Sequence, residues 1–144
     1  MSNKILVALD GSDGSKRALS AAAAQARLTG FDLVLAYVID WSPYSFHTPQ
    51  ELEERHQRRE SEIQRANDSI LTPEIAALEA DGLKVETVVH HGKIAETLLE
   101  LGKQQGATQI YIGRRGESRL QAMIFGSVSA ALVQTSTVPV TVVP

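Results

Sequence analysis

The stretch TQIYIGRRG, residues 108–116, decides the fold, because a short apolar run ends there in a glycine turn. The run over residues 108–112 predicts a buried strand. Gly113 and Gly116 predict a turn whose main chain a ligand can approach closely, since glycine has no Cβ and adopts backbone angles that other residues avoid. Bare amide N–H groups in such a turn, with a helix N-terminus beyond them, form a site suited to phosphate.

A second motif of small residues, Gly126-Ser127-Val128-Ser129, follows after nine intervening residues. It stands where the next helix is expected to begin, so its amides and hydroxyls could close the other side of an anion site. We therefore predict a nucleotide-phosphate binding loop near the C-terminus. The alternative is that Gly113 and Gly116 only turn the chain and that Gly126 only relieves helix packing.

The composition indicates an ordinary globular protein. A chain of 144 residues with 43% hydrophobic and 22% charged residues is expected to form one domain, residues 1–144. Its formal net charge of −3 argues against a nucleic-acid partner. The lack of cysteine excludes disulfides, thiolate metal sites and thiol catalysis. The N-terminal residues lack a signal-peptide pattern and the apolar runs are short, so we expect a cytoplasmic protein.

Strand-like and helix-like segments alternate along the chain. The predicted strands are residues 5–9, 31–39, 84–90, 109–112 and 138–143, and the predicted helices are residues 15–28, 49–82, 93–105 and 123–134. Right-handed crossovers turn this alternation into an α/β fold, a doubly wound five-stranded parallel sheet with helices on both faces. We expect its strand order to be 3-2-1-4-5. The fifth strand would then lie at an edge of the sheet.

Two local signals refine the long second helix. Residues 48–51 match a capping box, with Pro49 at the first helical position. Pro73 is expected to kink or restart this helix, with Thr72 as the new cap.

Two features that are distant in the sequence converge at one edge of the predicted sheet. Asp10 ends the first strand and Gly113 ends the fourth, and in the order 3-2-1-4-5 these strands flank the crevice where such sheets bind ligands. Asp10 either contacts the ligand or caps the helix that follows it. Ser12 and Asp13 can serve as the cap instead, so we favour a ligand contact for Asp10.

These residues resemble the ATP-binding branch of the universal stress protein family. The signature of that branch is Gly, two residues, Gly, nine residues, Gly, and then Ser or Thr, and it stands here as Gly113, Gly116, Gly126 and Ser127. The opening KILVALDGS, the stretch AYVID at residues 36–40 and the tail VPVTVV at residues 138–143 also resemble the family. The resemblance covers the whole chain.

The resemblance implies that ATP is the ligand, with Mg²⁺ or Mn²⁺ held between its phosphates rather than by protein side chains. It assigns Asp10 to the ribose and Val38 to adenine, with Ala8 packing nearby. It places Gly113, Arg115 and Gly116 along the ribose and phosphates, and Gly126, Ser127, Val128 and Ser129 around the phosphates. It further implies a homodimer through the last strand, Val138 to Val143, a role in stress survival, and a regulatory partner such as a membrane transport protein.

Efficient catalysis is not expected. The sequence has no GxxxxGK motif, and no histidine lies in the segment that contains Ser127 and Ser129 to act as a base. We predict an ATP-binding regulatory protein with no catalytic residues. Two alternatives stay open: a slow ATPase or phosphotransferase, and a nucleotide-independent adaptor module.

Overall fold

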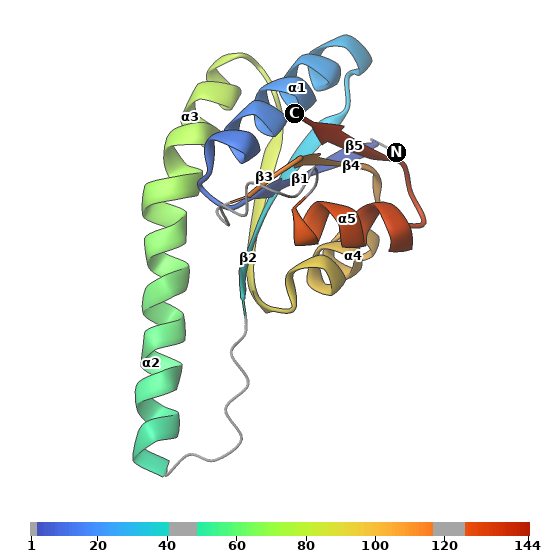
Figure 1. Cartoon of the computed structure of the whole chain (residues 1–144). Coiled ribbons are helices and arrows are strands. Elements are labelled where there is room, and N and C mark those ends of the chain that lie inside the picture. The colour runs from blue at the N-terminus through green and yellow to red at the C-terminus, as the bar shows by residue number, and fades with distance from the viewer. Residues whose placement is uncertain (1–2, 41–48, 117–125) are drawn as a thin grey trace.

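A computed structural model describes residues 3–40, 49–116 and 126–144. Its strands and helices alternate as predicted (Figure 1). The elements are β1 (Lys4–Leu9), α1 (Asp13–Thr29), β2 (Asp32–Asp40), α2 (Pro49–Ala66), the π-helical turn η1 (Asn67–Leu71), α3 (Thr72–Ala80), β3 (Val85–Gly92), α4 (Ile94–Gln105), β4 (Ala107–Gly113), α5 (Ser127–Thr135) and β5 (Val140–Val143).

The five strands form one sheet in the order β3-β2-β1-β4-β5, and every neighbouring pair is parallel. This confirms the predicted fold class and strand order. In the central strand β1, residues 5–9 are all buried, because helices cover both faces of the sheet. β1 and β4 pair with one irregularity: Lys4 lies opposite Ala107 and Ile5 opposite Gln109, so Thr108 is an extra residue in β4.

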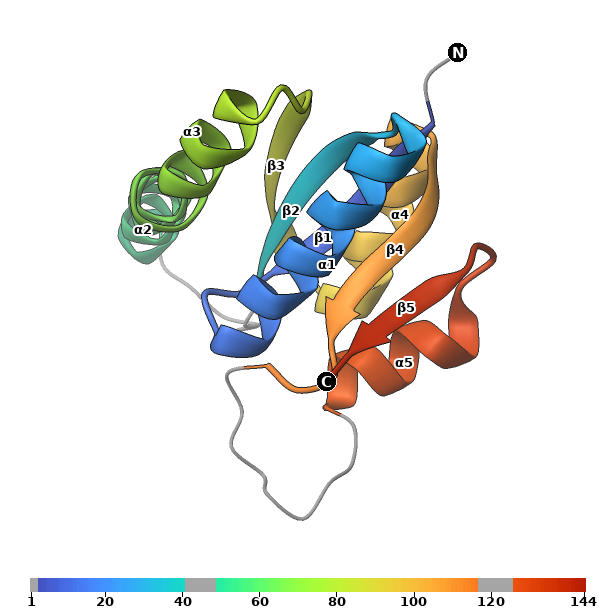
Figure 2. The same ribbon diagram turned by 90° about the horizontal axis from the view of Figure 1, so that it is seen from above.

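Alternate residues of the strands supply two separate cores. Ile5, Val7 and Leu9 pack with α1 and α3 on one face, whereas Leu6 and Ala8 pack with α4 and α5 on the other. Figure 2 shows α1 in front of the sheet and α4 and α5 behind it. The alanine-rich stripe of α1 is almost fully buried, which agrees with a helix lying close to the sheet.

Two helix boundaries differ from the sequence-based expectation. Thr72 does not cap a new helix, because α2 continues through η1 into α3, and Thr72 donates both its backbone N–H and its hydroxyl to the carbonyl of Asn67. A π-helical turn therefore takes up the irregularity expected at Pro73. α5 begins at Ser127, since Gly126 has extended angles. The predicted start of that helix at Met123, like Thr48 of the capping box, lies outside the described residues.

The other termini follow the predicted signals closely. Gly30 and Gly106 end α1 and α4 in the left-handed conformation. α2 begins at Pro49, and its N-terminal half extends beyond the rest of the molecule (Figure 1). Across residues 3–40, 49–116 and 126–144, none of the helices combines the length and the apolar character that crossing a membrane requires.

Candidate functional site

A cavity of about 440 Å³ opens where β2, β1 and β4 end at the carboxyl edge of the sheet. All of the residues predicted from the sequence to bind nucleotide line it. They are Ala8, Asp10, Val38, Gly113, Arg115, Gly116, Gly126, Ser127, Val128 and Ser129. The structure therefore brings these residues together, although their individual contacts with a ligand stay predictions.

Further residues line the same cavity and were not predicted from the sequence to bind a ligand. They are Leu9, Ser12, Ser15, Tyr37, Ile39, Asp40, Ile94, Leu98 and Ile112. Four of them, Leu9, Tyr37, Ile39 and Ile112, directly neighbour a predicted site residue at a strand end. The apolar spacing of α4 places Ile94 and Leu98 on its inward face, but it gives no sign that this face also reaches the cavity.

Asp10 supports the turn between β1 and α1 rather than capping the helix itself. Ser12 is the N-cap of α1, because its Oγ accepts from the backbone N–H of Ser15 at 3.2 Å. Asp10 Oδ1 in turn accepts from the backbone N–H of Ser12 at 2.9 Å and from the Ser12 hydroxyl. The helix-cap alternative for Asp10 is thus wrong, and the half-buried carboxylate lines the cavity beside the glycine turn.

The glycines of the turn are needed for space, not for unusual backbone angles. Among the described glycines, positive φ occurs at Gly11, Gly30, Gly82, Gly92 and Gly106, and not in the turn. A Cβ on Gly113 would lie 2.7 Å from the carbonyl carbon and oxygen of Gly14, and a Cβ on Gly116 would collide with Asp10 Oδ2. The turn is therefore packed directly against the start of α1, and the expectation that Gly113 and Gly116 adopt angles forbidden to other residues is wrong.

The two motifs of small residues meet across the end of β4. The backbone N–H of Gly126 donates to the carbonyl of Arg114 at 2.7 Å. Gly126 also lies close to Gly116, since a Cβ on Gly126 would be 3.6 Å from the Gly116 nitrogen. Both motifs therefore border one end of the cavity, as predicted.

The first turn of α5 offers main-chain donors at this end of the cavity. Ser127, Val128 and Ser129 are its first three residues, so their amides have no acceptor within the helix and carry the positive end of its dipole. The Ser129 hydroxyl behaves differently from the prediction, because it lies 2.8 Å from the carbonyl oxygen of Arg114 and 3.0 Å from that of Gly126. That hydroxyl proton is used within the protein, whereas the Ser127 side chain is exposed.

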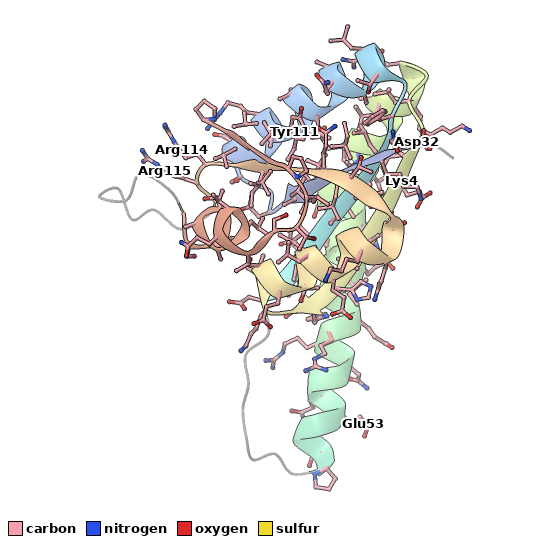
Figure 3. All side chains as sticks on the ribbon, turned by 90° about the vertical axis from the view of Figure 1, so that its right-hand side faces the viewer. Lys4, Asp32, Glu53, Tyr111, Arg114 and Arg115 are labelled. Carbon is pink, nitrogen blue, oxygen red and sulfur yellow. The ribbon has the colours of Figure 1, made fainter. Side chains whose placement is uncertain are left out.

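Only one of the two arginines of the turn borders the cavity. Arg115 is exposed and lines it, whereas Arg114 does not. Figure 3 shows both side chains pointing away from the sheet at this edge. The backbone N–H of Arg114 donates to the carbonyl of Val143 at 2.7 Å, which ties the turn to the end of β5. The Nε of Arg114 is buried and has no hydrogen-bond partner within the described part of the chain.

The chemistry of the cavity changes in order across the strand ends. Apolar side chains of β2, β1 and α4 (Val38, Ala8, Ile94 and Leu98) border one region, and the carboxylate of Asp10 ends β1 beside the glycine turn. Amide donors and Arg115 follow at β4 and α5. In the described ranges, His, Asp and Glu side chains do not form a group of three that could hold a metal ion.

Fold and cavity together define a doubly wound α/β protein with a ligand-sized crevice at the point where the strand order reverses. Residues 1–144 match the model of the universal stress protein family, and the chain belongs to that family. It is 32% identical to universal stress protein YxiE of Bacillus subtilis, over 99% of both chains.

Solved structures share the fold along nearly the whole chain. Universal stress protein UspA from Lactobacillus plantarum superimposes with a TM-score of 0.85 at 24% identity, covering 99% of this chain and 97% of the other. A universal stress protein solved in complex with cAMP superimposes with a TM-score of 0.65 at 23% identity, covering 99% of this chain and 97% of the other.

Proposed function

We propose that this protein binds ATP in the cavity and acts as a regulatory protein of the stress response. The observation that carries the proposal is the order of chemical groups across the strand ends. The apolar side chains at β2 suit the base of a nucleotide, the carboxylate at β1 suits its sugar, and the amide donors at β4 and α5 suit its phosphates, in the same spatial order.

The base is expected at the apolar region. Val38 and Ala8 line the cavity and are only 7% and 8% exposed, so they offer the base a small apolar surface. The bound cAMP in a structure of the same fold supports an adenine base, because cAMP is an adenine nucleotide. Asp10 lies between this region and the glycine turn, where its carboxylate can accept from a ribose hydroxyl.

The phosphates are expected between Gly113–Gly116 and the first turn of α5. There they would meet main-chain donors, the positive end of the helix dipole and Arg115. Mg²⁺ or Mn²⁺ would arrive with the nucleotide and reduce the repulsion between its phosphates. The described side chains supply no ligand cluster of their own for that ion.

The lining of the cavity supports nucleotide binding without efficient hydrolysis. Its described carboxylates are Asp10 and Asp40. Asp10 already accepts from two groups of Ser12, and Asp40 ends β2, two strands away from β4. A base for the attacking water is best placed near the terminal phosphate. We therefore propose that nucleotide occupancy is read by a second copy of the chain or by another protein.

Titration calorimetry of the full chain with ATP and Mg²⁺ tests the proposal, with Gly126→Val as the disrupting variant. A Cβ at Gly126 meets its neighbours at 3.4–3.6 Å, so this variant is expected to fold, while its added methyl groups occupy the phosphate end of the cavity. Ala24→Val, on the exposed side of α1, is the matched control. ATP binding is expected in the unaltered protein and the control only.

Two outcomes would contradict the proposal. Absence of ATP binding by the unaltered protein at millimolar nucleotide would leave the adaptor module as the explanation of the fold. Release of phosphate from labelled ATP faster than in buffer, in a single-turnover assay, would establish the ATPase alternative.

A further inference from the structure

The side chain of Ser129 is more deeply buried than is expected of a hydroxyl that contacts a bound phosphate directly. Ser129 is 2% exposed, yet its hydroxyl is within hydrogen-bond distance of two carbonyl oxygens. One of these belongs to Arg114, at the end of β4, and the other to Gly126, the N-cap of α5. The hydroxyl thus joins the residue that follows β4 to the N-cap of α5.

The carbonyl of Arg114 is the centre of this arrangement. It accepts from the Gly126 backbone N–H at 2.7 Å and from the Ser129 hydroxyl at 2.8 Å, so both contacts hold the start of α5 against the glycine turn. Arg114 is itself fixed to the sheet, because its backbone N–H donates to Val143 of β5. The start of α5 is therefore tied through Arg114 to the ends of β4 and β5.

We propose that Ser129 is a positioning residue for phosphate, and that it acts by clamping the first turn of α5 to the Arg114 carbonyl. The inference rests on the proposed function. Main-chain donors bind an anion well when the amides of both segments already point at one place before the ligand arrives. Any segment that must be ordered on binding lowers the affinity, because its lost conformational entropy opposes binding. The clamp supplies this preorganisation for the amides of residues 127–129 relative to residues 113–116.

The test compares Ser129→Ala with Thr135→Ala. Thr135 is a matched control, because its hydroxyl also donates to a backbone carbonyl within α5, that of Ala131 at 2.7 Å, at the exposed far end of the helix. ATP affinity is measured by calorimetry and adenosine affinity by ligand-observed NMR. Loss of one buried hydroxyl contact predicts ATP binding about tenfold weaker in Ser129→Ala. Adenosine, which has no phosphate, should bind within about twofold of the unaltered protein.

Two further measurements separate positioning from a general loss of structure. Hydrogen exchange of the nucleotide-free protein should quicken at residues 126–130 in Ser129→Ala and not in Thr135→Ala. Ser129→Thr keeps the hydroxyl and should restore most of the ATP affinity.

Each failure has a distinct meaning. If the unaltered protein binds no nucleotide, the proposed function fails and this inference falls with it. If the unaltered protein binds ATP and Ser129→Ala binds it equally well, only the role of Ser129 is overturned. An equal loss of ATP and adenosine binding in Ser129→Ala would also overturn it, because the effect would then not concern phosphate.

Discussion

Replacing Gly113 by alanine should destabilise the protein far more than the same change at Gly126. A Cβ at position 113 would lie 2.7 Å from the carbonyl carbon and oxygen of Gly14 and 3.2 Å from its Cα, so the start of α1 has to move. A Cβ at position 126 has its nearest neighbour, the Arg114 oxygen, at 3.4 Å. Neither glycine has positive φ, so the comparison isolates space from backbone strain.

The expected magnitudes follow from these contacts. Overpacking against rigid backbone typically costs about 1–3 kcal/mol, and each kcal/mol lowers the melting temperature of a domain of this size by about 4 °C. Gly113→Ala should therefore melt about 4–12 °C below the unaltered protein. Gly126→Ala should melt within about 4 °C, since replacing glycine by alanine at an N-cap typically costs about 1 kcal/mol or less.

Thermal unfolding followed by circular dichroism measures both variants without nucleotide. Melting temperatures within 2 °C of each other (about half of the shift that 1 kcal/mol produces) would show that α1 and the glycine turn yield easily. The argument that their backbones are packed against each other would then be refuted.

Three other changes probe separate parts of the molecule. The backbone N–H of Ile110 donates to the carbonyl of Pro139 and that of Arg114 to the carbonyl of Val143, so the backbone groups of Val140 and Val142 face the unpaired edge of β5. Val142→Pro removes an N–H from that edge. It should abolish the expected homodimer in sedimentation experiments and leave ATP binding intact. Asp10→Asn should weaken ATP binding about tenfold in calorimetry, the scale of one contact to a charged group, and an unchanged affinity would exclude a sugar contact. Leu132→Ala removes a fully buried side chain between α5 and the sheet and should lower the free energy of unfolding by about 2–5 kcal/mol in urea; a loss below about 1 kcal/mol would show that α5 packs loosely.

Much of the fold could be predicted because its signals are local. Ile5–Leu9 and residues 109–112 are short apolar runs flanked by turn residues, and Gly30 and Gly106 end helices by a rule that involves only their own backbone. The alternation of elements then indicates a doubly wound parallel sheet, and the predicted order 3-2-1-4-5 is one of the orders that such a sheet can take. The convergence of Asp10 and Gly113 follows from that strand order. The cavity lies at the carboxyl ends of β1 and β4, where such sheets bind ligands.

The features that could not be predicted depend on contacts between distant segments. The reason for Gly113 lies in Gly14, and the use of the Ser129 hydroxyl lies in the Arg114 carbonyl, neither of which a sequence pattern reveals. Thr72 and Pro73 show a different limit. Both a new cap and a π-helical turn accommodate a proline there, and in the structure the π-helical turn is found with Leu71 and Leu78 both in the core.

The extra residue Thr108 in β4 has a consequence for length variation in this chain. It lies at the amino end of the strand. The regular pairing with β1, in which Ile110 and Tyr111 face opposite sides of the sheet, begins only after it. Losing Thr108 would remove an irregularity and leave every later pairing of β4 unchanged, whereas losing one residue beyond Gln109 would reverse the side chains that follow. The base of this strand can thus absorb an insertion or deletion, and the end that borders the cavity cannot.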